Sequence, residues 1–390
     1  MTLKEAPRLE TRGDRIAALA TSFLCIDADA PVHSILEELN EPYSGAVAVV
    51  DARLRVLGLI TPEHLVELLG KPFGRDLLQR QSAREIMRPV ARFRADEYIA
   101  EVTERARGDF ERDTVSHYAL TGPDGAFAGH VSSQDLLHRA VMDRQREMAM
   151  ATTIQGRVVP PFLSLKGRQV SIVCSSVMAQ GVGGDYYHVR EYERGKWFFC
   201  LCDISGKGIS AAIITAVLAG FMHNADFSRP VGDLVAKLNA LVLDTFKLEK
   251  YLTGFFARFS EATGEIEYCD MGHSWFFAVE SGTLHQIGEQ ADNCPVGLSE
   301  IAQPVAKTLR ISPGTTFLLI SDGFVEQENG TGKTFPLETM GLAIADASSR
   351  GEDTARAKVR ILESFFTFKR EVPQRDDISM LIFEYREEPH

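Results

Sequence analysis

The stretch Cys202-Asp-Ile-Ser-Gly-Lys-Gly208 decides the fold, because it joins a strand-like run to a helix-like run through an aspartate and two glycines. The run that leads into it, Trp197–Cys202, is apolar and rich in aromatics, which predicts a strand. The residues after it, Ile209–Asn224, are rich in alanine and predict a helix that packs closely on a sheet. Asp203 is therefore expected between the end of a strand and the start of a helix.

Other aspartates stand in similar places along the chain. They are Asp185 in Val182-Gly-Gly-Asp-Tyr-Tyr187, Asp322 in Ile320-Ser-Asp-Gly-Phe324, and Asp376 with Asp377 in Arg375-Asp-Asp-Ile-Ser379. A single Asp-Gly pair is most often a turn. Carboxylates at strand ends, however, can converge from distant parts of a chain onto a hard divalent cation, because Mg²⁺ and Mn²⁺ prefer oxygen ligands. The ordered set predicts a metal site.

Along the chain, the motif of Asp185 comes first and that of Asp203 second. Met271-Gly-His-Ser274 follows, and then come the motifs of Asp322 and of Asp376 with Asp377. This order resembles the metal-dependent Ser/Thr protein phosphatases (PPM). Within that family it is most similar to the bacterial SpoIIE-like branch, over roughly residues 160 to 388. The resemblance implies an αββα sandwich, in which two stacked antiparallel sheets are flanked by helices. The predicted hairpins and separate helices favour the same α+β class.

The resemblance also implies a phosphatase site with two divalent cations, Mn²⁺ or Mg²⁺. Asp203 would bridge the cations and the backbone carbonyl of Ile204 would add a ligand. The second cation would be held by Asp322 and Asp376, with Asp377 as the alternative to Asp376. Asp185 would bind a cation or orient the bridging hydroxide, so the expected catalytic residues are Asp185 and Asp203. The full expected ligand set is Asp185, Asp203, Ile204, Asp322, Asp376 and Asp377.

The composition is that of an ordinary globular protein. The chain has 390 residues, 45% hydrophobic and 25% charged, which is enough for two or three domains. Its formal net charge of −12 argues against a nucleic-acid-binding surface, which would be basic. The six cysteines lie mostly in apolar runs without a C-x-x-C pair, so we expect reduced, buried thiols. With no signal-peptide core and no long apolar span, we expect a cytoplasmic protein that does not cross a membrane.

The N-terminal part contains an internal repeat of a helix, a β-hairpin and a second helix. Gly58 and Gly129 hold equivalent places, which gives an offset of 71 residues, from position 58 to position 129. The first copy is expected at Asp29–Leu39, Ala46–Ile60 and a helix from Thr61, and the second at Asp96–Ala106, His117–Val131 and a helix from Ser132.

This repeat resembles a pair of cystathionine-β-synthase (CBS) modules, which stack as a sensor and often bind adenine nucleotides. In such modules a Ser or Thr after the last strand and an Asp three positions later commonly hold the ligand. The candidate nucleotide-binding residues are therefore Thr61, Ser132 and Asp135, whereas His64 stands where the first copy should have its Asp. The alternative is that Ser132 and Asp135 only cap a helix N-terminus.

Residues 134–155 carry apolar side chains at helical spacing, and the pattern ends before Pro160-Pro161. This helix resembles the linker before SpoIIE-like catalytic domains. Its apolar stripe would pack either on the protein's own domains or on a second copy. We expect the full-length protein to be a homodimer in which this helix carries the signal between the sensor and catalytic units. The expected organisation is a CBS-pair regulatory domain at 1–138, a helical linker at 139–161 and a phosphatase domain at 162–390.

The expected function is dephosphorylation of a phosphoserine or phosphothreonine protein. The resemblance implies that this substrate is an anti-sigma-factor antagonist. A ligand of the CBS pair is expected to control the activity. The alternative is a nucleotide-sensing binding protein whose phosphatase fold engages partners with little turnover. Two further residues near the motifs each allow two interpretations. His273 is more often a hydrogen-bonded structural residue than an acid or base, and Lys207 could attract a substrate phosphate but is more often a solvated loop charge.

Overall fold

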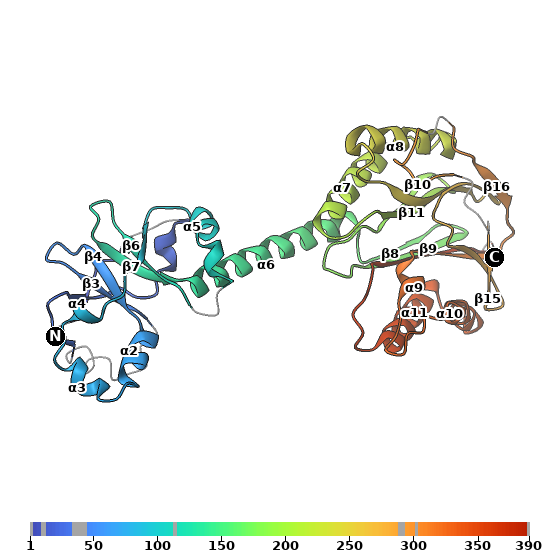
Figure 1. Cartoon of the computed structure of the whole chain (residues 1–390). Coiled ribbons are helices and arrows are strands. Elements are labelled where there is room, and N and C mark those ends of the chain that lie inside the picture. The colour runs from blue at the N-terminus through green and yellow to red at the C-terminus, as the bar shows by residue number, and fades with distance from the viewer. Residues whose placement is uncertain are drawn as a thin grey trace. The chain divides into compact units, whose positions relative to one another are not determined.

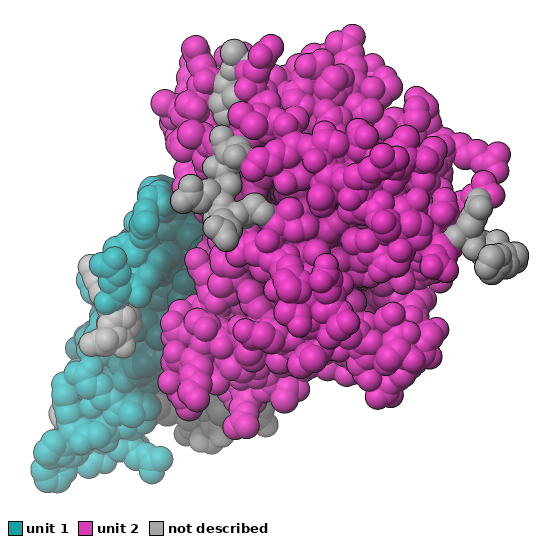
Figure 2. Space-filling view, turned by 90° about the vertical axis from the view of Figure 1, so that its right-hand side faces the viewer, with its two compact units in different colours: residues 1–146 teal, residues 147–390 magenta. Residues whose placement is uncertain are grey.

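The computed structural model describes residues 3–8, 13–32, 45–111, 115–287, 293–300 and 303–387. The chain divides into two compact units, residues 1–146 and residues 147–390, which Figure 2 shows in different colours. The boundary falls within helix α6 (Ser133–Val158), inside the predicted linker. The helix ends two residues before Pro160, where a proline would remove a backbone donor.

The N-terminal unit consists of two half-units with the same strand pattern. In each half, two parallel strands are followed by a third strand that pairs antiparallel with the second. The first half contains β1 (Lys4–Glu5), β2 (Leu24–Asp27), β3 (Val47–Val50), β4 (Val56–Ile60), α2 (Pro62–Leu69), α3 (Gly74–Leu78) and α4 (Ala83–Ile86). The second contains β5 (Ala91–Arg94), α5 (Ile99–Arg105), β6 (His117–Thr121), β7 (Phe127–Ser132) and the start of α6, and short 3₁₀ turns lie at Ile16–Leu19 and Arg107–Asp109.

The strand register confirms the predicted 71-residue repeat. Val49 pairs with Gly58 in the first half, and Leu120 pairs with Gly129 in the second. Each hairpin also has its register shift at the next position, between residues 49 and 50 and between residues 120 and 121. The predicted helix Asp29–Leu39 falls largely outside the described residues.

The C-terminal unit has four layers, with helices α7 and α8 on one side of two stacked sheets and α9, α10 and α11 on the other (Figure 1). The five-stranded sheet has the order β10-β11-β12-β13-β16, and the six-stranded sheet β15-β14-β17-β18-β9-β8. The predicted αββα sandwich is confirmed. Its strands are β8 (Phe162–Lys166), β9 (Val170–Val177), β10 (Tyr186–Glu193), β11 (Lys196–Ile204), β12 (Leu252–Ser260), β13 (Glu265–Met271), β14 (Phe276–Glu280), β15 (Thr283–Gln286), β16 (Lys307–Arg310), β17 (Thr316–Ile320) and β18 (Ile378–Tyr385), and its helices are α7 (Ile209–Asn224), α8 (Val231–Phe246), α9 (Gly323–Glu326), α10 (Glu338–Ser349) and α11 (Thr354–Lys369).

The central strands are apolar on both faces because each sheet is covered on both sides. In β11, residues 197–202 are all buried, with the second sheet on one face and α7 on the other. Phe383 of β18 packs against Phe199 and Phe259, so aromatic rings fill the space between the sheets. This rigid core holds the strand ends, and the aspartates that follow them, in place. Among the described residues, no helix is long and apolar enough to span a bilayer.

Candidate functional site

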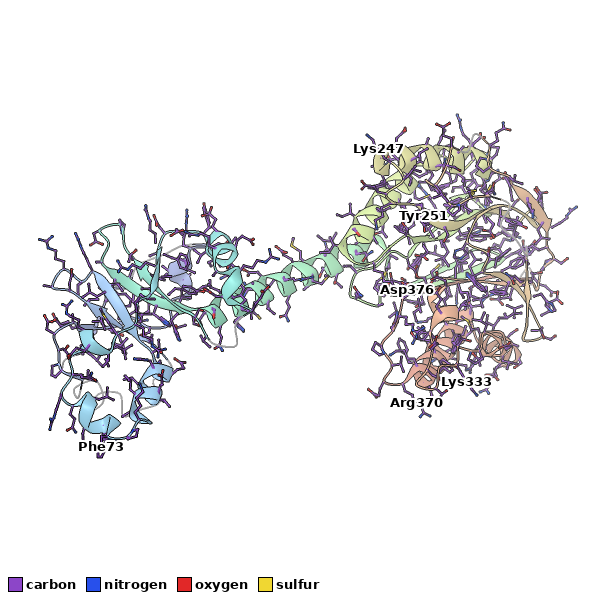
Figure 3. The ribbon with its side chains drawn as sticks, in the orientation of Figure 1. Phe73, Lys247, Tyr251, Lys333, Arg370 and Asp376 are labelled. Carbon is purple, nitrogen blue, oxygen red and sulfur yellow. The ribbon has the colours of Figure 1, made fainter. Side chains whose placement is uncertain are left out.

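A cavity of about 370 Å³ lies where the ends of the two sheets meet. Asp203 reaches it from the end of β11 in the five-stranded sheet, together with the residue after it, Ile204. Asp322, at the N-terminus of α9, and Asp376, just before β18, reach it from the six-stranded sheet. The fold thus brings these four predicted residues into one cavity. Figure 3 labels Asp376 and another cavity residue, Tyr251, which precedes β12.

Asp185 and Asp377 lie behind this cavity and are both buried. The Oδ1 atom of Asp377 accepts a hydrogen bond from the backbone N–H of Ala179 at 2.8 Å, and its Oδ2 atom accepts one from Gly184 at 2.7 Å. A side chain at Gly183 would collide with this carboxylate, which is why the motif needs glycine there. Asp377 therefore holds the Gly-Gly-Asp loop, whereas its neighbour Asp376 lines the cavity.

Burial and mutual repulsion raise the pKa values of the clustered carboxyl groups. Desolvation, followed by the charges of Asp322 and Asp376, raises the pKa of Asp203 to about 8. Desolvation, followed by the charge of Glu326, raises the pKa of Asp322 to about 6. The pKa of Asp185 lies well above its ordinary value because of burial and the nearby charge of Asp203. A cation in this cavity would relieve the repulsion among these groups.

The donor set fits a hard divalent cation. Oδ2 of Asp185 is buried without a hydrogen-bond partner, and the carboxylates that line the cavity offer only oxygen ligands. Within the described part of the chain, no three His, Cys, Asp or Glu side chains already stand close enough together to enclose a metal ion. Instead, Oδ2 of Asp376 lies 2.7 Å from the Nζ atom of Lys207.

Several cavity residues were not singled out in the sequence, among them Glu326 and Tyr251. Glu326 is the last residue of α9, one helical turn after Asp322, so both carboxylates face the cavity. The spacing in Asp322-Gly-Phe-Val-Glu326 is the signal that would have found it. Tyr251 has no such signal, since its loop position depends on the tertiary fold. His273 also lines the cavity, where burial lowers its pKa to about 4, so it is uncharged at neutral pH.

Gln155, in the last turn of α6, is buried against the Gly-Gly-Asp loop. Its Nε2 atom donates to the carbonyl of Gly183 at 2.7 Å and to Oγ1 of Thr215 at 3.1 Å. Its Oε1 atom accepts a hydrogen bond from the N–H of Gly183 at 3.0 Å. One side chain of the linker helix thus joins the loop that carries Asp185 to helix α7.

The N-terminal unit has its own cavity of about 550 Å³, beside the N-terminus of α2. Thr61 and His64 line it, and Thr61 also caps α2 by accepting a hydrogen bond from the N–H of His64 at 3.2 Å. Ser132 and Asp135 are not among its lining residues. They form a capping box at the start of α6, in which Ser132 Oγ donates to Asp135 Oδ2 at 2.6 Å and accepts from the N–H of Asp135 at 3.2 Å.

Comparison with known families fits this geometry. Residues 193–386 match the family described as Stage II sporulation protein E (SpoIIE), and residues 16–71 match the family described as CBS domain. The C-terminal unit is a SpoIIE-type PP2C phosphatase domain. The N-terminal unit carries a CBS domain.

Individual relatives of the SpoIIE-type domain are distant. The phosphoserine phosphatase RsbP of Bacillus subtilis (strain 168) is 23% identical over 192 residues, which cover 47% of this chain. The chain covers only 46% of the length of that relative. The solved SiaA-PP2C domain of Pseudomonas aeruginosa aligns with a TM-score of 0.52 and 20% identity, over 63% of this chain and 98% of that one, and supports the fold. The catalytic domain of the phosphatase PstP, solved with 2 manganese ions, aligns with a TM-score of 0.41 and 14% identity over 56% of this chain and 99% of that one.

Proposed function

We propose that the protein is a metal-dependent phosphatase of phosphoserine or phosphothreonine proteins, with Mn²⁺ or Mg²⁺ as its cofactor. The observation that carries this proposal is the convergence of Asp203, Asp322 and Asp376 from two sheets into one cavity. The raised pKa values of Asp203 and Asp322 support it, because they reflect carboxylates crowded together at a cost that a bound cation would offset.

A phosphate monoester hydrolyses very slowly in water, so the site must supply a nucleophile and neutralise charge on the phosphoryl group. Two divalent cations sharing carboxylates supply both when bound. Asp203 and the carbonyl of Ile204 would hold them from one sheet, and Asp322 and Asp376 would hold them from the other. Asp185, whose Oδ2 lacks a hydrogen-bond partner, would bind a cation or orient the attacking water. Asp377 supports the Gly-Gly-Asp loop and is not a ligand.

The substrate class follows from the likeness to RsbP, which is named a phosphoserine phosphatase. Within that class, the resemblance to the SpoIIE-like branch favours a phosphorylated anti-sigma-factor antagonist. The regulatory ligand is an adenine nucleotide of the CBS unit. The cavity at Thr61 supports this assignment better than Ser132 and Asp135, whose side chains hydrogen-bond to each other.

The direct test is hydrolysis of p-nitrophenyl phosphate by the full-length protein in Mn²⁺, in Mg²⁺ and in excess EDTA. We expect turnover only with metal, and a loss of at least about a hundredfold in Asp203→Asn, because that variant would lack a carboxylate ligand of the cations that supply the nucleophile. Turnover that persists in EDTA, or in Asp203→Asn at saturating Mn²⁺, would contradict the metal site. Metal binding without any turnover would favour a protein that binds partners over an enzyme.

A further inference from the structure

Lys207 is the only lysine or arginine among the described residues that line the cavity of the SpoIIE-type domain. Its Nζ atom lies 2.7 Å from Oδ2 of Asp376 and donates to the backbone carbonyl of Arg375 at 2.6 Å. The ammonium group is charged at neutral pH, as lysine side chains ordinarily are. The sequence-based view of Lys207 as a solvated loop charge does not account for these contacts.

Both carboxylate oxygens of Asp376 already have donors. Oδ1 accepts a hydrogen bond from the N–H of Asp377 at 2.8 Å, within the turn that leads into β18. Oδ2 is taken by Lys207, which lines the same cavity as Asp376. A divalent cation that bound Asp376 through Oδ2 would meet the ammonium at close range, and like charges repel. Lys207 and such a cation therefore compete for the same oxygen.

The Lys207 side chain can leave Asp376 without disturbing the fold. It is 45% exposed, and its loop is shaped by the flanking residues Gly206 and Gly208, with φ of 93° and 74°. An ammonium released from Asp376 stays at the rim of the cavity that would receive a phosphoryl group. The segment just before Asp185, Met178-Ala-Gln-Gly181, has no basic side chain that could contact the phosphoryl group instead. Lys207 is thus the cation placed to meet that phosphoryl group.

We propose that Lys207 is a specificity-determining residue with two mutually exclusive partners, the carboxylate of Asp376 and the phosphoryl oxygens of the substrate. A divalent cation on Asp376 exchanges the first partner for the second. The ammonium thereby opposes metal binding and favours phosphate binding once metal is present. This inference rests on the proposed phosphatase function.

Calorimetric titration of the full-length protein measures both effects. Mn²⁺ is titrated into wild type and Lys207→Met, and orthophosphate is then titrated into each protein at saturating Mn²⁺. We expect Lys207→Met to bind Mn²⁺ about three- to fivefold more tightly, as for loss of a partly exposed ion pair. Orthophosphate should bind to it at least about threefold more weakly, because the one Lys or Arg side chain among the described residues that line the cavity has lost its charge.

Two further variants separate charge from shape. Lys207→Arg keeps the charge and should stay within about twofold of wild type in both titrations, within the spread for exposed pairs. Lys333→Met removes the same charge from an exposed lysine outside the cavity and should change neither affinity (Figure 3). Thermal unfolding shows whether each variant is folded.

If Lys207 had only a structural role, replacing it would not change the Mn²⁺ and orthophosphate affinities in opposite directions. The proposal is overturned if Lys207→Met binds Mn²⁺ no more tightly than wild type, or if its orthophosphate affinity is unchanged. Hydrolysis of p-nitrophenyl phosphate is assayed in parallel. If wild type binds Mn²⁺ and orthophosphate but does not hydrolyse the ester, the enzymatic function fails while both titrations still test Lys207.

Discussion

Asp376 and Asp377 are adjacent in the chain but face opposite sides of the site. Asp376 lines the cavity with its carboxylate on Lys207, whereas Asp377 is buried and accepts two backbone hydrogen bonds from the Gly-Gly-Asp loop. From the sequence, both residues were possible metal ligands, and Asp376 was the preferred one. It could not separate them further, because their roles depend on Ala179 and Gly184, which lie nearly 200 residues earlier.

Exchanging each residue for its amide should separate these roles. Asp377→Asn should lower the free energy of unfolding by about 1–3 kcal/mol, because an amide NH₂ faces a buried N–H donor. Asp376→Asn should change it by less than about 1 kcal/mol, since it loses a partly exposed ion pair. Urea unfolding in EDTA measures both values. Mn²⁺ affinity should fall at least about tenfold in Asp376→Asn, which loses a carboxylate ligand. Equal stability losses in the two variants would refute the division of roles.

A pair of buried histidines should make the N-terminal unit less stable in acid. Nδ1 of His117 lies 2.8 Å from Nε2 of His130, and Nε2 of His117 lies 3.4 Å from the carboxylate of Glu63. Burial, followed by the neighbouring charge of His117, lowers the pKa of His130 from 6.5 to about 4, although Asp135 and Glu63 act in the opposite direction. Burial also lowers the pKa of His117.

A histidine with a lowered pKa binds fewer protons in the folded than in the unfolded state, so folding stability falls as the pH drops from about 6.5 to about 4. Between pH 7 and pH 5 we expect His130 to cost the unit about 2 kcal/mol. Hydrogen exchange of the β6 and β7 amides in the full-length protein measures this loss. His130→Gln should flatten the pH dependence, and His285→Gln, at an exposed site, should leave it unchanged. Equal slopes in wild type and His130→Gln would contradict the expectation.

At the scale of single elements, the sequence predicted most of the C-terminal unit. Helix α7 has its expected bounds, and the hairpins β10–β11, β12–β13 and β14–β15 form around the expected turns. Local patterns suffice here, because aromatic runs and Gly turns specify strands and hairpins. The contacts of Gln155 could not be predicted in this way. A glutamine near the end of a helix has no pattern of its own, and its partners lie 28 and 60 residues away.

Removing the Gln155 side chain should loosen the loop that carries Asp185. Gln155→Ala leaves the buried N–H and carbonyl of Gly183 without their partners, which should cost about 2 kcal/mol of stability. Half-maximal activity should then require at least about threefold more Mn²⁺, because ordering the loop is added to the cost of binding. Thr153→Ala, at an exposed site on the same helix, is the matched control. An unchanged Mn²⁺ requirement would show that the loop is ordered without Gln155.

At the scale of the whole molecule, we propose that the exposed part of the apolar stripe of α6 is the interface of a homodimer. Leu136 is fully buried, but Leu137 and Val141 are each 47% exposed, Met150 is 67% exposed and Ile154 is 53% exposed. Packing within one chain thus satisfies only part of the predicted stripe. A second copy would cover the rest, since isologous helix pairing buries the same residues from both chains. Because Gln155 belongs to the same helix, a change in this pairing would reach the loop of Asp185 through a single element.

Charges on the exposed stripe should therefore abolish both this proposed dimer and the proposed control of activity by nucleotide. In Val141→Glu/Met150→Glu, four buried apolar side chains per dimer become charged, and we expect the dissociation constant to rise by at least about a hundredfold. Light scattering measures the oligomeric state, and Mn²⁺-dependent hydrolysis with and without AMP or ATP measures the response. The matched control is Leu342→Glu/Val359→Glu, which alters two exposed apolar residues of α10 and α11. The control should remain a responsive dimer. A wild-type monomer, or a double variant that still responds to nucleotide, would leave α6 as a packed linker without a regulatory role.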